Sequence, residues 1–125
     1  MCHEFGHVLG LPDLFDQSTV TATGQLDPEE DSAGVGKWCL MTSTGARGWG
    51  VEDGPNAFCA WALAKLGWVE VVELTQSQPD LAIEDVALGH QVYKIRLSAD
   101  EYFLIENRRR ASSYYNSNIP GEGRL

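Results

Sequence analysis

The sequence predicts an α+β fold in which helices occupy the first part of the 125-residue chain and short strands the last part. Two observations support this class. Apolar residues recur three or four apart within residues 1–9 and again within residues 55–66, which is typical of helices that bury one face. After residue 67, segments rich in β-branched residues or alternating in polarity replace that pattern, which favours strands.

The first predicted helix, residues 1–9, carries two histidines four positions apart. His3 and His7 therefore share a helix face, where both imidazoles can bind one metal ion. Glu4 lies beside them, so its carboxylate can take a proton from a metal-bound water and return it to a leaving amine. The apolar residues expected to pack this helix are Met1, Phe5, Val8 and Leu9.

A turn follows this helix and supplies a third candidate ligand. Gly10 can adopt the left-handed conformation that ends a helix, and Pro12 prevents the helix from resuming. The turn is expected to bring Asp13 back toward the histidines, which leaves a fourth position for water, as in catalytic zinc sites. Asp16 is the alternative for this role.

A long loop is predicted up to residue 53, since Gly, Ser, Thr and Asp dominate this stretch. It contains an acidic cluster that offers oxygen ligands to calcium: Asp27, Glu29, Glu30 and Asp31. Their spacing matches no calcium-binding loop, which favours a solvated acidic loop over a calcium site.

A second helix is predicted from Asp53-Gly54-Pro55 to about Leu66, where Gly67 ends it. Residues 68–74 then form a strand, because most of them are apolar and several are β-branched. Trp61 and Trp68 are expected in the core.

Shorter strands are predicted beyond residue 75, at residues 81–83, 92–97 and 102–106. The last two are expected to pair as an antiparallel hairpin through the turn at residues 98–101. His90 lies beside Gly89 in a turn and is expected to be solvated. The arginines at positions 108, 109 and 110 are interpreted as a solvated strand end.

The three cysteines, Cys2, Cys39 and Cys59, permit at most one internal disulfide, and the sequence alone does not select the pair. Buried free thiols are the favoured interpretation for all three. Cys2 is not expected to join the metal site, because adjacent helical residues point about 100° apart.

The formal charge of −9 and the predicted pI near 4.6 argue against a nucleic-acid partner, which requires a basic face. No stretch approaches the roughly 20 apolar residues of a membrane-spanning helix, so no membrane partner is expected.

These motifs resemble the immune inhibitor A-type metalloproteases, relatives of the metzincins that bacteria typically secrete. Residues 3–13 read H-E-F-G-H-V-L-G-L-P-D and, with the next three residues, are similar to the family's zinc helix and following loop. Residues 36–41, G-K-W-C-L-M, resemble its Met-turn, which implies that Met41 lies beneath the metal as an apolar floor. Residues 55–69, 102–108 and 119–123 are similar to later family segments. One departure is Asp13, where typical metzincins carry a third histidine.

The resemblance implies that residues 1–74 are the C-terminal part of a zinc metalloprotease catalytic domain, with active-site helix, long Met-turn loop and second helix. Residues 75–125 then begin an antiparallel, β-rich, sandwich-like module. Only two residues precede His3 and the chain ends in a turn, so we expect a fragment that lacks part of the substrate-binding wall and is inactive alone.

The resulting functional hypothesis is a secreted zinc-dependent endopeptidase acting on a protein or peptide. His3, His7 and Asp13 are the expected metal ligands, and Glu4 is the expected general acid/base. One alternative is a binding or structural module that keeps the zinc site without catalysis. Another is a hydrolase that uses the same helix on a different amide or ester.

Overall fold

The computed structural model describes residues 2–15, 34–42 and 55–121. Asp16 and the acidic cluster at residues 27–31 lie outside these ranges. The elements in chain order are α1 (Cys2–Val8), η1 (Gly36–Trp38), α3 (Ala60–Leu66), β1 (Glu70–Glu73), α4 (Val86–Gly89), β2 (Gln91–Arg96), β3 (Tyr102–Ile105), η2 (Arg110–Ser112) and η3 (Tyr114–Asn116). The α+β class is confirmed. None of the described helices has the length and apolar character needed to cross a membrane.

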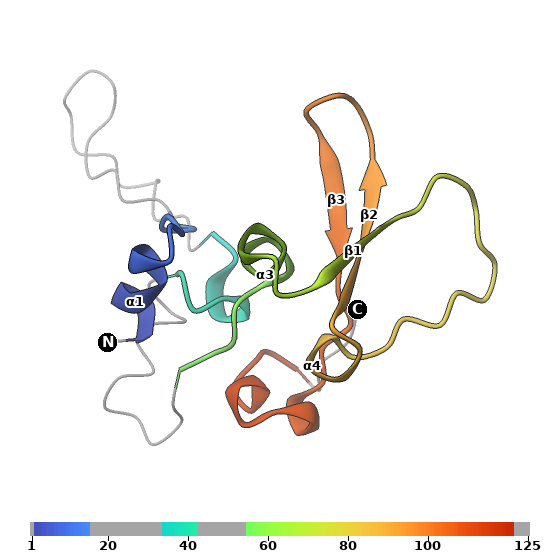
Figure 1. Ribbon diagram of the computed structural model, residues 1–125. Coiled ribbons are helices and arrows are strands. Elements are labelled where there is room, and N and C mark those ends of the chain that lie inside the picture. Colours follow the sequence, from blue (N-terminus) through green and yellow to red (C-terminus); the bar gives the residue numbers. More distant parts are fainter. Residues whose placement is uncertain (1, 16–33, 43–54, 122–125) are drawn as a thin grey trace, which may run out of the picture.

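Helix α3 lies between the predicted metal-binding helix and the sheet. Figure 1 shows α1 and η1 on one side of α3 and the three strands on the other. Two buried clusters account for this arrangement, because α3 contributes Cys59 (at its N-cap) and Ala62 to one and Ala60 to the other. The first cluster also contains Leu11, Cys39 and Met41, and the second also contains Val86 and Val92.

The sheet is mixed, with strand order β1-β2-β3. The predicted hairpin is confirmed, because β2 and β3 pair antiparallel, with Tyr93 opposite Ile105 and Arg96 opposite Tyr102. Strand β1 instead runs parallel to β2. The expectation of a purely antiparallel segment is therefore corrected, and the connection that contains α4 makes the parallel crossover.

Residues 81–83, predicted as a strand, form none, although Asp85 makes an isolated bridge to Asn107. Asp85 explains the local structure. Its side-chain Oδ1 accepts from Ala87 N at 2.9 Å and caps α4, while its Oδ2 accepts from Arg109 N at 2.6 Å. This buried carboxylate fixes the chain just after residues 81–83, where Ile83 O accepts from the Asn107 side chain at 2.7 Å and not from a neighbouring strand.

The segment after β3 returns to α3 and the Met-turn. Ala57 N donates to Tyr115 O at 3.1 Å, and the Arg108 guanidinium donates to Trp38 O and Phe58 O at 2.8 and 2.6 Å. Arg108 is 1% exposed, so its interpretation as part of a solvated strand end was wrong. Arg109 and Arg110 are exposed, as expected.

The predicted division of the chain at residue 74 stays a prediction.

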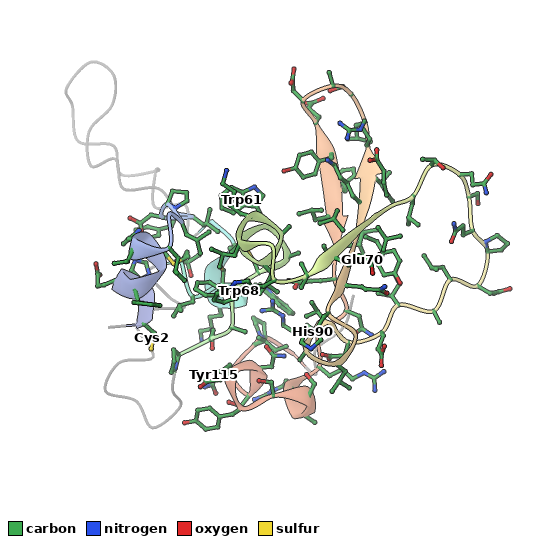
Figure 2. All side chains as sticks on the ribbon, in the orientation of Figure 1. Cys2, Trp61, Trp68, Glu70, His90 and Tyr115 are labelled. Carbon is green, nitrogen blue, oxygen red and sulfur yellow. The ribbon has the colours of Figure 1, made fainter. Side chains whose placement is uncertain are left out.

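Three further expectations about burial need correction. Phe5 and Val8 on α1 are 60% and 78% exposed, because the buried side of α1 contains His3 and Gly6. Trp68 is 52% exposed and contacts Phe58 edge to face, whereas Trp61 packs partly buried on the first cluster. Figure 2 shows these two tryptophans near α3 and His90 beside α4, where it is exposed as expected.

The second helix is also shorter than predicted. It begins at Ala60, and residues 55–59 lead into it without helical structure. Within this lead-in, Leu40 N donates to Ala57 O and Asn56 Nδ2 donates to Lys37 O. These hydrogen bonds hold the lead-in extended against the Met-turn, so its backbone donors and acceptors are used there.

Candidate metal centre

Helix α1 brings His3 and His7 to one side, as their spacing of four predicts. Their ring centroids lie 4.8 Å apart and the ring planes are nearly perpendicular, at 86°. His3 is buried and His7 is partly buried. The two imidazoles therefore approach a common point from different directions.

The end of α1 follows from Gly10. Leu11 N donates to Gly6 O at 3.1 Å and Gly10 N donates to His7 O at 2.9 Å, the paired hydrogen bonds of a Schellman motif. Gly10 has φ of +89°, a conformation that residues with a Cβ rarely adopt. Leu11 is then buried in the first cluster, which turns the chain back toward α1.

Asp13 returns to the histidines by this turn. Its Oδ1 lies 2.9 Å from His3 Nε2 and 3.6 Å from His7 Nε2. One ligand atom from each of these residues can be chosen so that all three lie within 4.8 Å of one another. Among the described residues, this is the cluster of histidine, cysteine and carboxylate side chains that fits a metal ion.

Each imidazole is oriented by a backbone carbonyl. His3 Nδ1 lies 2.9 Å from Leu40 O, and His7 Nδ1 lies 2.8 Å from Leu11 O. A carbonyl oxygen only accepts, so each Nδ1 carries a hydrogen and each Nε2 faces the cluster. Metal-binding histidines are commonly oriented in this way, and two imidazole nitrogens with one carboxylate suit zinc.

The Met-turn, residues 36–41, lies under α1. Met41 is fully buried, and its carbonyl accepts from Leu14 N at 2.8 Å, which ties the segment to the loop that carries Asp13. Thr42 Oγ1 donates to Cys39 O at 2.9 Å and also contacts Gly36 O, so the turn is closed on itself. Leu40 O, the acceptor for His3, is thereby held in place.

Glu4 is exposed on α1, outside the three-residue cluster. It lines the rim of an open, mainly apolar groove of about 560 Å³, together with Cys2, Phe5, Val8, Leu9, Leu40, Phe58 and Trp68. Its carboxylate is accessible to solvent and to any molecule that reaches this side of α1.

The sequence analysis missed an ion pair, Arg108 and Glu106, whose arginine also contacts the Met-turn. Arg108 Nη2 donates to Glu106 Oε2 at 2.9 Å while the same guanidinium holds the carbonyl of Trp38. Burial raises the pKa of Glu106, and the charge and hydrogen bond of Arg108 oppose that shift. Residues two apart on an extended segment share a face, so the E-x-R pattern after β3 was a usable signal.

Comparison with known families follows this geometry. The family described as "Immune inhibitor A peptidase M6, catalytic domain" matches residues 1–68, more than half of the chain. The chain belongs to this family. The predicted resemblance is confirmed, and the match runs from α1 through α3 to Trp68. Members of the immune inhibitor A family are zinc metalloproteases and are typically secreted. No curated protein and no solved structure matches the chain.

Proposed function

We propose that this chain carries the metal site and the general acid/base of a zinc-dependent endopeptidase. His3, His7 and Asp13 are the proposed zinc ligands, and Glu4 is the proposed acid/base. The observation that carries the proposal is the convergence of two carbonyl-oriented imidazoles and one carboxylate, with ligand atoms within 4.8 Å of one another. Family membership supports the same chemistry, with a protein or peptide as substrate.

The proposed roles follow from where the side chains lie. Zinc, when bound, supplies a Lewis acid that polarises a carbonyl and lowers the pKa of water. His3 and His7 present Nε2 because their Nδ1 hydrogens are bound to carbonyl oxygens, so little reorientation is needed to bind metal. Glu4, exposed on the same helix, takes the proton from the attacking water and delivers it to the leaving amine. Met41 packs against Gly6 of α1 as an apolar floor beneath the proposed zinc site and contributes no ligand.

Glu4→Gln tests the catalytic part of this proposal. The purified protein is loaded with zinc, and hydrolysis of a quenched fluorescent peptide is measured together with bound zinc. We expect hydrolysis to fall by about 10²–10⁴-fold while zinc content is unchanged, because the amide cannot carry the proton. Glu101→Gln, an exposed glutamate in the turn between β2 and β3, is the matched control and should retain activity. Equal activity in Glu4→Gln and wild type, with both above the background of the zinc-free protein, would refute the role of Glu4.

The ligand set is tested by zinc affinity, measured by competition with a chromophoric chelator. His3→Ala, His7→Ala and Asp13→Ala should each weaken binding by 10-fold or more, on the order of the 10–100-fold seen even for outer-shell changes. Asp16→Asn is the comparison, since Asp16 is the alternative third ligand and lies outside the described residues. Weak binding in Asp16→Asn with normal binding in Asp13→Ala would transfer the third position to Asp16.

The second candidate is a module that keeps the zinc site without catalysis. The observation that favours it is the place of the sheet. The described strands lie on the far side of α3 from α1, so none of them borders the candidate site (Figure 1). Stoichiometric zinc binding by the wild-type chain with no detectable hydrolysis of peptides or esters would favour this candidate. Hydrolysis of esters but not peptides would instead favour a non-proteolytic hydrolase.

We also propose secretion, which family membership supports. The acidic cluster at residues 27–31 keeps its two interpretations, calcium ligands or a solvated loop. Calcium-dependent thermal stability, measured with and without a calcium chelator, distinguishes them.

A further inference from the structure

Two buried cysteines meet where the Met-turn approaches the start of α3. Cys39 is fully buried and Cys59 is 7% exposed. Cys59 N donates to Cys39 Sγ at 3.3 Å, and Met41 N donates to the same sulfur at 3.4 Å. Leu40 N donates to Ala57 O at 3.1 Å, so the two backbone segments are held beside each other. The two cysteines therefore lie side by side in one buried cluster, although 20 positions separate them in the sequence.

The third cysteine lies elsewhere. Cys2 is exposed, which corrects the expectation that all three cysteines are buried, and Figure 2 shows it on α1 close to the N-terminus. It lines the open groove beside Glu4, and Cys39 and Cys59 do not. The pairing that the sequence left open is thus narrowed to Cys39 and Cys59 by position.

The surroundings of the pair shift the pKa values of the two thiols in opposite directions. The hydrogen bond from the Cys59 thiol, the backbone N–H groups of Cys59 and Met41, and the nearby Arg108 charge together lower the pKa of Cys39 to about 7, against the effect of burial. The same thiol–thiol hydrogen bond and burial raise the pKa of Cys59. The two shifts favour Cys39 over Cys59 as the thiolate while the pair is together, and the thiolate is the form that attacks a disulfide.

We propose that Cys39 and Cys59 form an intramolecular disulfide that ties the Met-turn to the N-terminus of α3. The oxidant is a low-molecular-mass disulfide. The Cys39 thiolate attacks one of its sulfurs and expels a thiolate, which leaves a mixed disulfide on Cys39. Cys59 then loses its proton, attacks the Cys39 sulfur and expels the second thiolate. Two protein thiols are oxidised and one external disulfide is reduced to two thiols. Because Cys39 has no exposed surface, the exchange takes place during folding or local opening.

This bond bears directly on the candidate metal centre. It encloses residues 39–59, and Leu40, whose carbonyl orients His3, follows the bonded Cys39. A covalent bond at this point restrains the Met-turn against α3. Such bonds persist in oxidising compartments, in keeping with a family that is typically secreted. The inference does not depend on catalysis, since it rests on the proximity of the two buried cysteines.

The test counts thiols in the full chain. The protein is equilibrated with oxidised and reduced glutathione in the presence of EDTA, quenched in acid, unfolded, alkylated and weighed by mass spectrometry. We expect one alkylated cysteine of the three, a protein lighter than the reduced form by about 2 Da before alkylation, and a proteolytic peptide linking Cys39 to Cys59. Three alkylated cysteines in oxidising buffer, or a linked peptide that contains Cys2, would overturn the proposal.

Two variants keep the test independent of folding defects. Cys2→Ser leaves the buried pair intact and should give no alkylated cysteine under the same conditions. Cys39→Ser should give two alkylated cysteines and no linked peptide. In Cys2→Ser, the oxidised form should also melt at a higher temperature than the reduced form. Identical melting of both forms would show that the bond does not restrain the Met-turn against α3.

Discussion

The contact between Gly6 and Met41 provides the sharpest test of how the metal centre is built. Gly6 is buried in the middle of α1, where the helix backbone lies directly on the Met41 side chain. A Cβ added at Gly6 would overlap Met41 Sδ and would lie 3.1 Å from Met41 Cε and 3.5 Å from Phe58 Cε1. Met41 is fully buried, so its thioether cannot move aside into solvent. Gly6→Ala must therefore displace the Met41 side chain, α1, or both.

Two opposing terms set the size of the effect. Overpacking a buried site costs about 1–3 kcal/mol. Replacing glycine by alanine inside a helix contributes about 1 kcal/mol in the other direction. We expect Gly6→Ala to lower the free energy of unfolding by roughly 1 kcal/mol, because the first term exceeds the second. It should also weaken zinc binding, since a shifted α1 moves His3 relative to Leu40 O.

The substitution Met41→Ala should reverse the sign of the effect that Gly6→Ala has on the free energy of unfolding. That substitution alone should cost about 2–5 kcal/mol, but it removes the atoms with which the new Cβ would collide. In the Met41→Ala background, Gly6→Ala should stabilise the protein by up to about 1 kcal/mol, from helix propensity alone. The two substitutions should therefore be coupled by about 1–3 kcal/mol.

Urea unfolding of the four proteins in this cycle measures the coupling. Val8→Ala is the control, because Val8 is on the same helix and 78% exposed, and its effect should stay within about 0.5 kcal/mol. If Gly6→Ala changes the free energy of unfolding equally with Met and with Ala at position 41, then α1 does not pack against Met41. The interpretation of Met41 as the apolar floor beneath the candidate metal centre would then be wrong.

Three further predictions concern the segment beyond α3. Arg108→Met should lower the free energy of unfolding by about 3–5 kcal/mol, because it removes the partner of the partly buried Glu106 and the donor to two backbone carbonyls, whereas Arg109→Met, an exposed control, should change it little in the same urea assay. The pKa of Glu106 is raised above its usual 4.5. Between pH 4.5 and the folded pKa, the folded state therefore keeps a proton on Glu106 that the unfolded state has lost. The contribution of Glu106 to stability is therefore present at and below pH 4.5 and lost as pH rises through the folded pKa, and Glu106→Gln should abolish that decline in a pH series of unfolding curves. A chain cut after residue 74 should lose cooperative unfolding, monitored by circular dichroism, and an equally cooperative transition would instead support a domain boundary there.

The sequence carried enough information to predict the metal cluster because each part of it is local. Helical periodicity places His3 and His7 together, and the left-handed Gly10 accounts for the return of Asp13. The structure brings these three residues together as expected. The carbonyl of Leu40 that orients His3 could not be predicted, since any residue supplies a backbone carbonyl and 37 positions separate the two.

The failed predictions share a different cause, which is that burial depends on what packs against a residue. Arg108 belongs to a run of three arginines, a pattern typical of solvated surface, yet it is buried because Glu106 and two backbone carbonyls accept its hydrogens. Trp68 was expected in the core from its residue type alone. It follows the glycine that ends α3, where its N–H donates to Leu63 O and its ring stays half exposed.

The candidate metal centre depends on residues beyond the segment that matches the family. The match ends at residue 68, but Arg108 holds the carbonyls of Trp38 and Phe58, which flank the two buried cysteines. Tyr115 O accepts from Ala57 N on the same side, so the lead-in to α3 is fixed by the C-terminal segment as well. The position of Leu40 O therefore depends on three supports: the closed Met-turn, the packing of α3, and the returning chain. Since His3 presents Nε2 only while Leu40 O accepts from its Nδ1, loss of the C-terminal supports should reduce zinc affinity even with every proposed ligand intact.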